Sequence, residues 1–299
     1  MNIDTYNEIR SGRAGFYQQK RGLIAVWGKE AVQFLDGLVT NSVKTLEDGA
    51  QMLAAFPDAK GRLIAVVKAR RQDDRFLIET EDATRDMVFQ NLFRFTFAGD
   101  FFVEDLSDRY VYFEIFGPKN DVYNPNASEK WPGIIDFEMP FGAAYFVPNE
   151  LANEFRSFLS DENGCLAVDD ELYDLLRIEA GIPQYGVDMD DTTIVPELGL
   201  EGLISYNKGC YIGQEIIARI HFRGHVAKQL TGVTLSAPVA AGIEITSDDK
   251  SAGRITSVTY SPKLASTIAL AYVRHEHLTA GTGLKAGDAD AIVTPLPFS

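Results

Sequence analysis

A chain of 299 residues is long enough for two domains with substantial cores, and 45% hydrophobic with 24% charged residues excludes a disordered or fibrous protein. Its 28 basic and 43 acidic residues give a net charge of −15, which disfavours bulk binding to the phosphate backbone of nucleic acids. The N-terminus has no apolar signal segment, no apolar run is long enough to span a bilayer, and two cysteines form no disulfide framework, so a cytoplasmic protein without membrane contact is predicted.

Short strands and helices follow one another along the first 180 residues, which predicts an α+β region. The expected strands are apolar runs bounded by turn residues, at 22–27, 52–56, 62–69, 76–80, 101–103, 110–116 and 143–147. The expected helices are a short one that opens at 28–30 and ends by Thr40 and Asn41, and longer ones at 82–94, 151–159 and 170–180. Asp82 is expected to cap the second helix, Asp169 or Asp170 is expected to cap the last, and residues 117–133 read as a surface loop.

The residue pattern of the sequence changes near residue 226. Beyond it, short β-type segments at 230–235, 243–246, 254–260 and 267–273 alternate with turns of glycine, proline and aspartate. That pattern is typical of a small antiparallel barrel. The predicted domains are therefore an α+β region over 1–225 and an all-β barrel over 226–299.

Cys210 lies in the stretch NKGCYIGQE, just ahead of a helix expected to begin near Gly213. The positive end of that helix and the neighbouring Lys208 would both favour a thiolate, which predicts a pKa below that of a free thiol. Gly209 and Gly213 permit a positive φ or the close approach of another backbone or ligand. The alternative is a buried structural cysteine, which is the reading that we favour for Cys165, followed by an apolar run.

The stretch NKGCYIGQE resembles the signature of the YgfZ-type folate-binding proteins, which are relatives of the glycine-cleavage T-protein, an aminomethyltransferase. Residues 26–43, 177–200 and 252–273 are similar to further family segments in the same order. The resemblance implies an α+β fold of three subdomains in a ring around a central folate channel. Two of them would be intertwined α+β subdomains, and the third a small C-terminal antiparallel β-barrel. The implied cofactor is tetrahydrofolate.

The resemblance also implies a set of folate-binding residues. Glu197 matches a carboxylate that faces the pterin ring, which is chemically sensible because a carboxylate accepts two N–H bonds from an aminopyrimidine edge. Tyr185 matches an aromatic residue of the pocket, and a turn that lines the pocket is matched by Leu38, Thr40 and Asn41. The cations for the glutamate tail are matched by Arg223, His225 and Lys228. Each position also has an ordinary reading as core or surface, and Arg177 and Glu179 could equally be structural ion-pair partners.

One departure from the aminomethyltransferase pattern bears on function. Ala65 and Val66 stand where that enzyme has an acidic pair, and neither side chain can exchange a proton. Together with Cys210, this points to the branch that supports iron–sulfur cluster assembly or repair, including in enzymes of tRNA modification. We therefore expect a tetrahydrofolate-binding protein with a redox-active Cys210, assisted by Lys208, whose partners are folate and iron–sulfur proteins or assembly factors.

Two other functions stay open from the sequence. One is an aminomethyltransferase or another folate-dependent one-carbon transferase, and the other is a folate-binding regulatory module without chemistry of its own. A resident metal is not expected, because one cysteine with His221 and His225 nearby lacks the paired spacing of metal ligands.

Overall fold

The computed structural model describes residues 2–117, 130–140 and 142–298, except for the side chains of Ala98 and Arg223. Contacts between residues divide the chain into two compact units. Unit 1 comprises Met1–Phe34, Val43–Leu53 and Val67–Tyr173, and unit 2 comprises Leu35–Ser42, Ala54–Val66 and Asp174–Ser299. Each unit is thus assembled from separated segments of sequence, and the predicted division at residue 226 stays a prediction.

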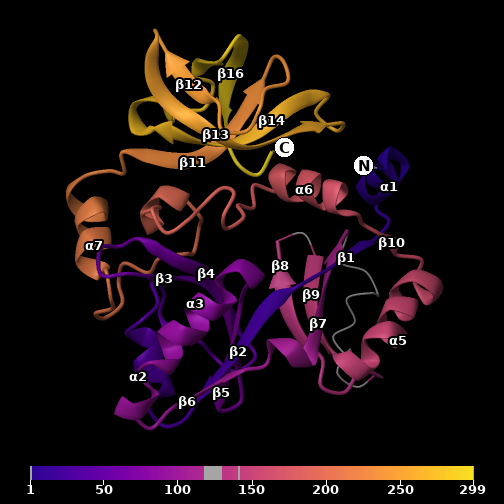
Figure 1. Cartoon of the computed structure of the whole chain (residues 1–299), viewed down its shortest axis with the longest axis vertical. Coiled ribbons are helices and arrows are strands. Elements are labelled where there is room, and N and C mark those ends of the chain that lie inside the picture. The colour runs from indigo at the N-terminus through magenta and orange to yellow at the C-terminus, as the bar shows by residue number, and fades with distance from the viewer. Residues whose placement is uncertain (1, 118–129, 141, 299) are drawn as a thin grey trace. The chain divides into compact units, whose positions relative to one another are not determined.

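One sheet of unit 1 has the strand order β10-β1-β7-β9-β8 (Figure 1). Neighbouring strands are antiparallel except for β1 and β10, which are parallel. The strands are β1 (Gly15–Gln19), β7 (Tyr110–Phe116), β8 (Ile135–Met139), β9 (Gly142–Pro148) and β10 (Leu166–Ala167). Alternate residues of β7 enter two cores, with Phe113 and Ile115 in one and Tyr112 in the other, because side chains alternate between the faces of a strand.

A second sheet has the order β3-β4-β5-β2-β6. Its strands are β2 (Arg21–Trp27), β3 (Gln51–Pro57), β4 (Leu63–Gln72), β5 (Arg75–Glu81) and β6 (Phe102–Asp105). Lys20 alone separates β1 from β2, so one extended segment passes from the first sheet into the second. The core around Tyr112 includes Leu23 and Leu77, and so joins faces of both sheets within unit 1.

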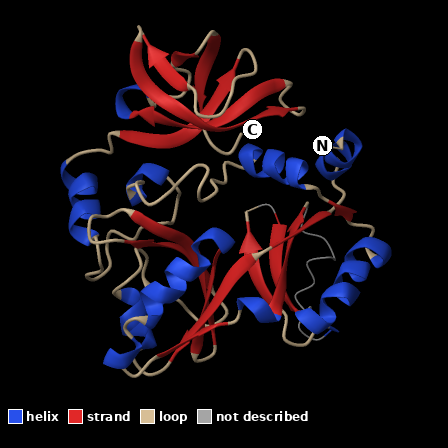
Figure 2. Ribbon diagram, in the orientation of Figure 1, coloured by secondary structure: helices blue, strands red, loops and turns tan. Residues whose placement is uncertain are grey.

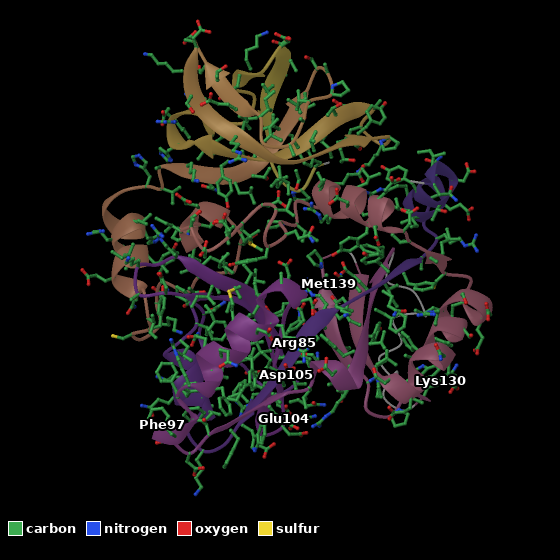
Figure 3. The ribbon with its side chains drawn as sticks, viewed as in Figure 1. Arg85, Phe97, Glu104, Asp105, Lys130 and Met139 are labelled. Carbon is green, nitrogen blue, oxygen red and sulfur yellow. The ribbon has the colours of Figure 1, made fainter. Side chains whose placement is uncertain are left out.

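The α-helices described within the first 160 residues are short. They are α1 (Ile3–Arg10), α2 (Ala31–Asp36), α3 (Asp82–Phe93) and α5 (Ala152–Ser157). Helix α3 packs against β2, β5 and β6, and Arg85 at its start donates from Nε to Asp105 of β6 at 2.7 Å (Figure 3). This ion pair fixes the helix to the edge strand of the second sheet.

Unit 2 contains a closed barrel in the order β11-β14-β13-β12-β15-β16, drawn as red strands in Figure 2. Its strands are β11 (Lys228–Leu235), β12 (Glu244–Ser247), β13 (Lys250–Ser261), β14 (Ser266–Arg274), β15 (Gly283–Ala286) and β16 (Ala289–Thr294). Along β14, Ala269, Ala271 and Val273 fill the interior, whereas Leu270 and Tyr272 pack on a separate cluster outside it. Helices α6 (Asp170–Glu179) and α7 (Gln214–Arg223) precede the barrel.

The predicted α+β class with a C-terminal antiparallel barrel is confirmed. The prediction that Asp82 caps its helix was wrong, since α3 begins at Asp82 and its N-cap is Glu81, whose side chain makes no capping bond. Asp169 does cap α6, accepting from the backbone N–H of Leu172 at 2.8 Å. Most of the predicted loop, residues 118–129, lies outside the described residues. In the parts of the chain that the structure covers, no helix is long and apolar enough to cross a membrane.

Candidate functional site

The signature lysine is buried in unit 2. Lys208 is 1% exposed, and its Nζ donates to the backbone oxygens of Asp36, Val39 and Asn41 at 2.7, 2.8 and 2.7 Å. It also lies 3.5 Å from Oδ1 of Asp36. These oxygens follow the last turn of α2, where backbone carbonyls lack helical partners and a cation is favoured. Lys208 therefore ties the signature to the segment 35–42.

The two signature glycines have different surroundings. Gly213 has a φ of 80°, and a Cβ there would lie 2.4 Å from the backbone oxygen of Asp58 and 3.3 Å from Cα of Gly61. Glycine is thus required at Gly213 both by conformation and by the hairpin turn against it, as the sequence predicted. A Cβ on Gly209 would meet nothing within 4 Å among the described atoms. The space beside Gly209 is open.

The two cysteines also differ. Cys210 is exposed, whereas Cys165 is buried in the core of unit 1, where burial raises the pKa of its thiol. The predicted helix after Cys210 is confirmed, since α7 begins at Gln214 with Gly213 as its N-cap. The ring of Tyr206 stacks on His221 of α7 with centroids 3.5 Å apart. This contact holds the loop that carries Cys210 to the helix behind it.

The turn after α2 is held by side chains that bond to the backbone. Thr40 Oγ1 donates to the oxygen of Leu203 at 2.6 Å and accepts from the N–H of Ala55 at 2.9 Å. Asn41 Nδ2 donates to the oxygen of Gly202 at 2.7 Å. Leu38 is buried beside them in the sequence. Thr40 and Asn41 therefore join three segments of unit 2.

Glu197 lies in a 3₁₀ turn (Val195–Leu198) and is buried, and its Oε2 accepts from the N–H of Ile194 at 3.4 Å. Burial raises the pKa of this carboxyl group, and the charge of Lys228 opposes the rise. The ammonium of Lys228 lies 4.7 Å from the centre of the Tyr272 ring. A carboxylate, a cation and an aromatic ring thus come together where β11 and β14 pair.

Tyr272 was missed by the sequence reasoning. It lies on β14, where alternation separates the barrel interior from the outer face, and only the packing shows that the outer face at Tyr272 is covered. Asp190 was also missed. Its pKa is lowered by a hydrogen bond from Thr192 and by the charge of Lys228, so a second carboxylate lies near this cation.

The side chains of Arg177 and Glu179 form hydrogen bonds with residues of the barrel. Arg177 Nη1 donates to Asp188 at 2.8 Å, and Nη2 donates to the hydroxyl of Ser257 on β13 at 2.9 Å. Ser261, also on β13, donates to Glu179 at 2.5 Å. Of the two readings left open by the sequence, these contacts favour the structural one.

The remaining predicted positions are placed as follows. Tyr185 is half-buried in a turn and forms an isolated bridge with Met189. The ring of His225 stacks on His275, with centroids 3.9 Å apart. The side chain of Arg223 lies outside the described part of the chain. Among the residues that the structure describes, no group of three or more potential ligands could hold a metal.

Two family profiles match the chain: "GCVT N-terminal domain" over residues 3–123, and "Glycine cleavage T-protein C-terminal barrel domain" over residues 228–298. Together they span most of the sequence in the order expected from the resemblance. The chain belongs to the glycine-cleavage T-protein family.

Its relatives carry different names. The aminomethyltransferase of Pseudothermotoga lettingae is 25% identical over 99% of this chain and 89% of that protein. The tRNA-modifying protein YgfZ of Klebsiella pneumoniae is 27% identical over 68% of this chain and 65% of that protein. The iron-sulfur cluster assembly factor IBA57 homolog, mitochondrial, of Mycosarcoma maydis is 27% identical over 70% of this chain and 54% of that protein.

A solved structure shows the same fold. The glycine cleavage system aminomethyltransferase T from Bartonella henselae has a TM-score of 0.89 to this chain at 19% identity, and the match covers 99% of this chain and 89% of that one.

Proposed function

We propose that this protein binds tetrahydrofolate and, through Cys210, supports the assembly or repair of iron–sulfur clusters in other proteins, including enzymes of tRNA modification. The observation that carries the folate part is the buried carboxylate of Glu197 beside Lys228 and the ring of Tyr272. The relatives named for tRNA modification and for iron–sulfur assembly support the second part.

The residues around Glu197 fit a folate. Among the described residues, Glu197 accepts one long hydrogen bond, so its carboxylate has acceptor sites for the N–H groups of a pterin edge. The ring of Tyr272 supplies an aromatic wall. Lys228 interacts with Glu197 itself. Arg223 and His225 remain the residues expected at the glutamate tail. Thr40 and Asn41 position the neighbouring turn through their backbone contacts.

The surroundings of Cys210 suit contact with another molecule. The thiol is exposed, and the neighbouring Gly209 borders open space although its backbone does not require glycine. A side chain at Gly209 would obstruct a partner that approaches the sulfur of Cys210. This supports a role in which Cys210 meets a client protein or its cluster.

The alternative function is aminomethyl transfer, which the name of the Pseudothermotoga relative favours. Against it, Ala65 is fully buried and Val66 is half-buried on β4, and neither can supply the carboxylate that the transferase pattern has there. An assay for methylene-tetrahydrofolate formed from an aminomethyl carrier separates the two functions.

Replacing Glu197 with alanine is expected to weaken tetrahydrofolate binding by about 1.5–3 kcal/mol, or about 10- to 100-fold in Kd, because charge-assisted hydrogen bonds are lost. Isothermal titration calorimetry measures this directly. The control is Glu201→Ala, an exposed glutamate of the same segment. Absence of binding to the unaltered protein would refute the folate proposal, whereas equal affinity of Glu197→Ala would refute only the role of Glu197.

Cys210→Ala is expected to fold and to bind tetrahydrofolate normally, yet to leave iron–sulfur enzymes inactive in cells that lack the native protein. The reason is that an exposed thiol contributes little to packing. The measurement is the activity of iron–sulfur enzymes after complementation, with Cys165→Ala as the matched control. Full complementation by Cys210→Ala would remove the thiol from the mechanism.

A further inference from the structure

A second group of polar side chains lies within unit 1. They come from both of its sheets and from the start of α6, and we call them the polar cluster: Gln19, Arg21, Lys68, Glu79, Tyr112, Glu114 and Tyr173. They adjoin the apolar core that contains Tyr112. Ionisable residues are rarely buried unless they are paired or functional, so each partner matters.

The ion pair of Arg21 and Glu79 is complete. Arg21 Nε donates to Glu79 Oε1 at 2.6 Å, and a second guanidinium nitrogen contacts the same oxygen. Lys68 is less well paired. Its Nζ lies 3.7 Å from Glu79 Oε2, and it also donates to the thioether sulfur of Met139, a weak acceptor. An ammonium has three donors, so Lys68 keeps N–H groups for a further acceptor.

The hydroxyl of Tyr112 has no hydrogen-bond partner among the described residues, although the side chain is 1% exposed. Burial raises the pKa of this phenol, and the charges of Glu114 and Glu79 raise it further. The hydroxyl is therefore protonated and can donate. Buried hydroxyl groups without a partner are rare in folded proteins, and such a group calls for an acceptor.

The charge balance of the polar cluster depends on Glu114. This residue is 4% exposed, and its Oε2 accepts from Gln19 Nε2 at 3.2 Å. Burial raises the pKa of Glu114, against the opposing charges of Lys68 and Arg21. When Glu114 is protonated, Arg21 and Lys68 face a single carboxylate, and the cluster carries one net positive charge.

We propose that the polar cluster binds a small carboxylate anion. The Lys68 ammonium and the Tyr112 hydroxyl donate to its two oxygens. Glu114 adds a third hydrogen bond only when its carboxyl group carries a proton. A monoanion matches the single excess charge, whereas a cation would be repelled. The side chains of Arg21 and Lys68 each keep 17% exposure, so solvent reaches the cluster. The residues of this site lie within unit 1, whereas Glu197, Lys228 and Tyr272 lie within unit 2.

Anion binding at this site should vary with pH. Charged and titratable groups act on Glu114 or its neighbours from β1, β2, β4, β5, β7 and α6. They are Tyr17, Arg21, Lys68, Glu79, Glu81, Tyr112, Asp170 and Tyr173. Of the acidic groups, Glu79 is kept ionised by Arg21 and Lys68, which lower its pKa against the effect of burial. Ionisation of Glu114 on raising the pH cancels the excess positive charge, so affinity for the anion falls.

The test uses sodium acetate as the probe, with acetamide as a neutral molecule of similar size and sodium chloride at equal ionic strength. The full chain is melted at increasing probe concentrations between about pH 5.5 and 8, since a ligand that binds the folded state raises the melting temperature. Acetate should raise it more than either control, and most strongly at the acidic end. Tyr112→Phe should weaken acetate about tenfold, since it removes one hydrogen bond of a charged ligand.

Two further variants sharpen the result. Lys68→Met should abolish the acetate effect, whereas Lys29→Met, at an exposed lysine of unit 1, should retain it. Glu114→Gln keeps a donor that cannot ionise, so its acetate affinity should not change with pH. The proposal is overturned if acetate acts no more than chloride, if acetamide acts equally, or if Tyr112→Phe binds acetate as tightly as the unaltered protein. Tyr112→Phe keeps the test decisive should Lys68→Met fail to fold.

Discussion

Replacing Glu79 with glutamine is expected to lower the free energy of unfolding by about 3–5 kcal/mol, because it leaves the buried guanidinium of Arg21 without its counter-charge. Glu79 is buried, accepts from Arg21 Nε at 2.6 Å, and also faces Lys68 at 3.7 Å. Urea denaturation measures the change. The control is Glu104→Gln, whose exposed partner is Arg109 and whose loss should cost about 0–1 kcal/mol.

The pH dependence gives an independent check of the same pair. Burial alone would raise the pKa of Glu79, but Arg21 and Lys68 outweigh it and the pKa lies below the ordinary value of 4.5. The pair therefore stabilises the fold fully above pH 4.5, and this contribution is lost as the pH falls through the lowered pKa. Glu114 acts in the opposite sense, because its raised pKa makes stability fall as the pH rises above 4.5.

Glu79→Gln should accordingly lose the part of the acid destabilisation that comes from Glu79, while the decline caused by Glu114 at higher pH persists. An unfolding free energy for Glu79→Gln equal to that of the unaltered protein at neutral pH would show that Arg21 finds other partners. That result would also count against the proposed anion site, because the charge balance of the site assumes that Glu79 neutralises Arg21.

Local patterns predicted most of the regular structure for a physical reason. Strand β7 is rich in β-branched and aromatic residues, and barrel strand β14 is a long, mostly apolar run, so burial and propensity agree. Strand β1 was missed because its sequence, GFYQQ, has polar residues where the polar cluster needs them. Strands β15 and β16 were missed because their small residues fit the barrel interior only once its closure is known.

The residues of the candidate site also fall into those that local sequence predicts and those that depend on distant contacts. The signature NKGCYIGQE and the helix that follows it could be predicted, because both are contiguous in sequence. The partners of Lys208 could not, since the backbone oxygens it binds lie 167 to 172 residues earlier in the chain. Glu114 illustrates the limit further. It belongs to a strand that was predicted correctly, but the pKa of its buried carboxyl group depends on residues of the other sheet.

The second prediction with a large effect concerns Lys208 itself. Lys208→Met is expected to lower the free energy of unfolding by about 3 kcal/mol, because the buried carboxylate of Asp36 loses its ammonium and backbone oxygens of the 36–41 segment lose a donor. The sequence predicted a chemical role for Lys208 beside Cys210, and that role stays a prediction. The bonds from Lys208 to the end of α2 indicate a structural role as well.

The two roles make different predictions for the same variant. A lysine that acts only on the thiol would leave stability unchanged when it is lost, and would abolish function in a folded protein. A lysine that fastens the signature to the 35–42 segment would reduce stability first, and would loosen Cys210 and the turn at Thr40 together. Urea denaturation of Lys208→Met, with Lys285→Met as the control, decides between them. Lys285 pairs with Asp290 at 2.6 Å on the barrel surface, so its loss should cost less than about 1 kcal/mol. If Lys208→Met unfolds at the same urea concentration as the unaltered protein and still fails to support iron–sulfur enzymes, the chemical role is the correct one.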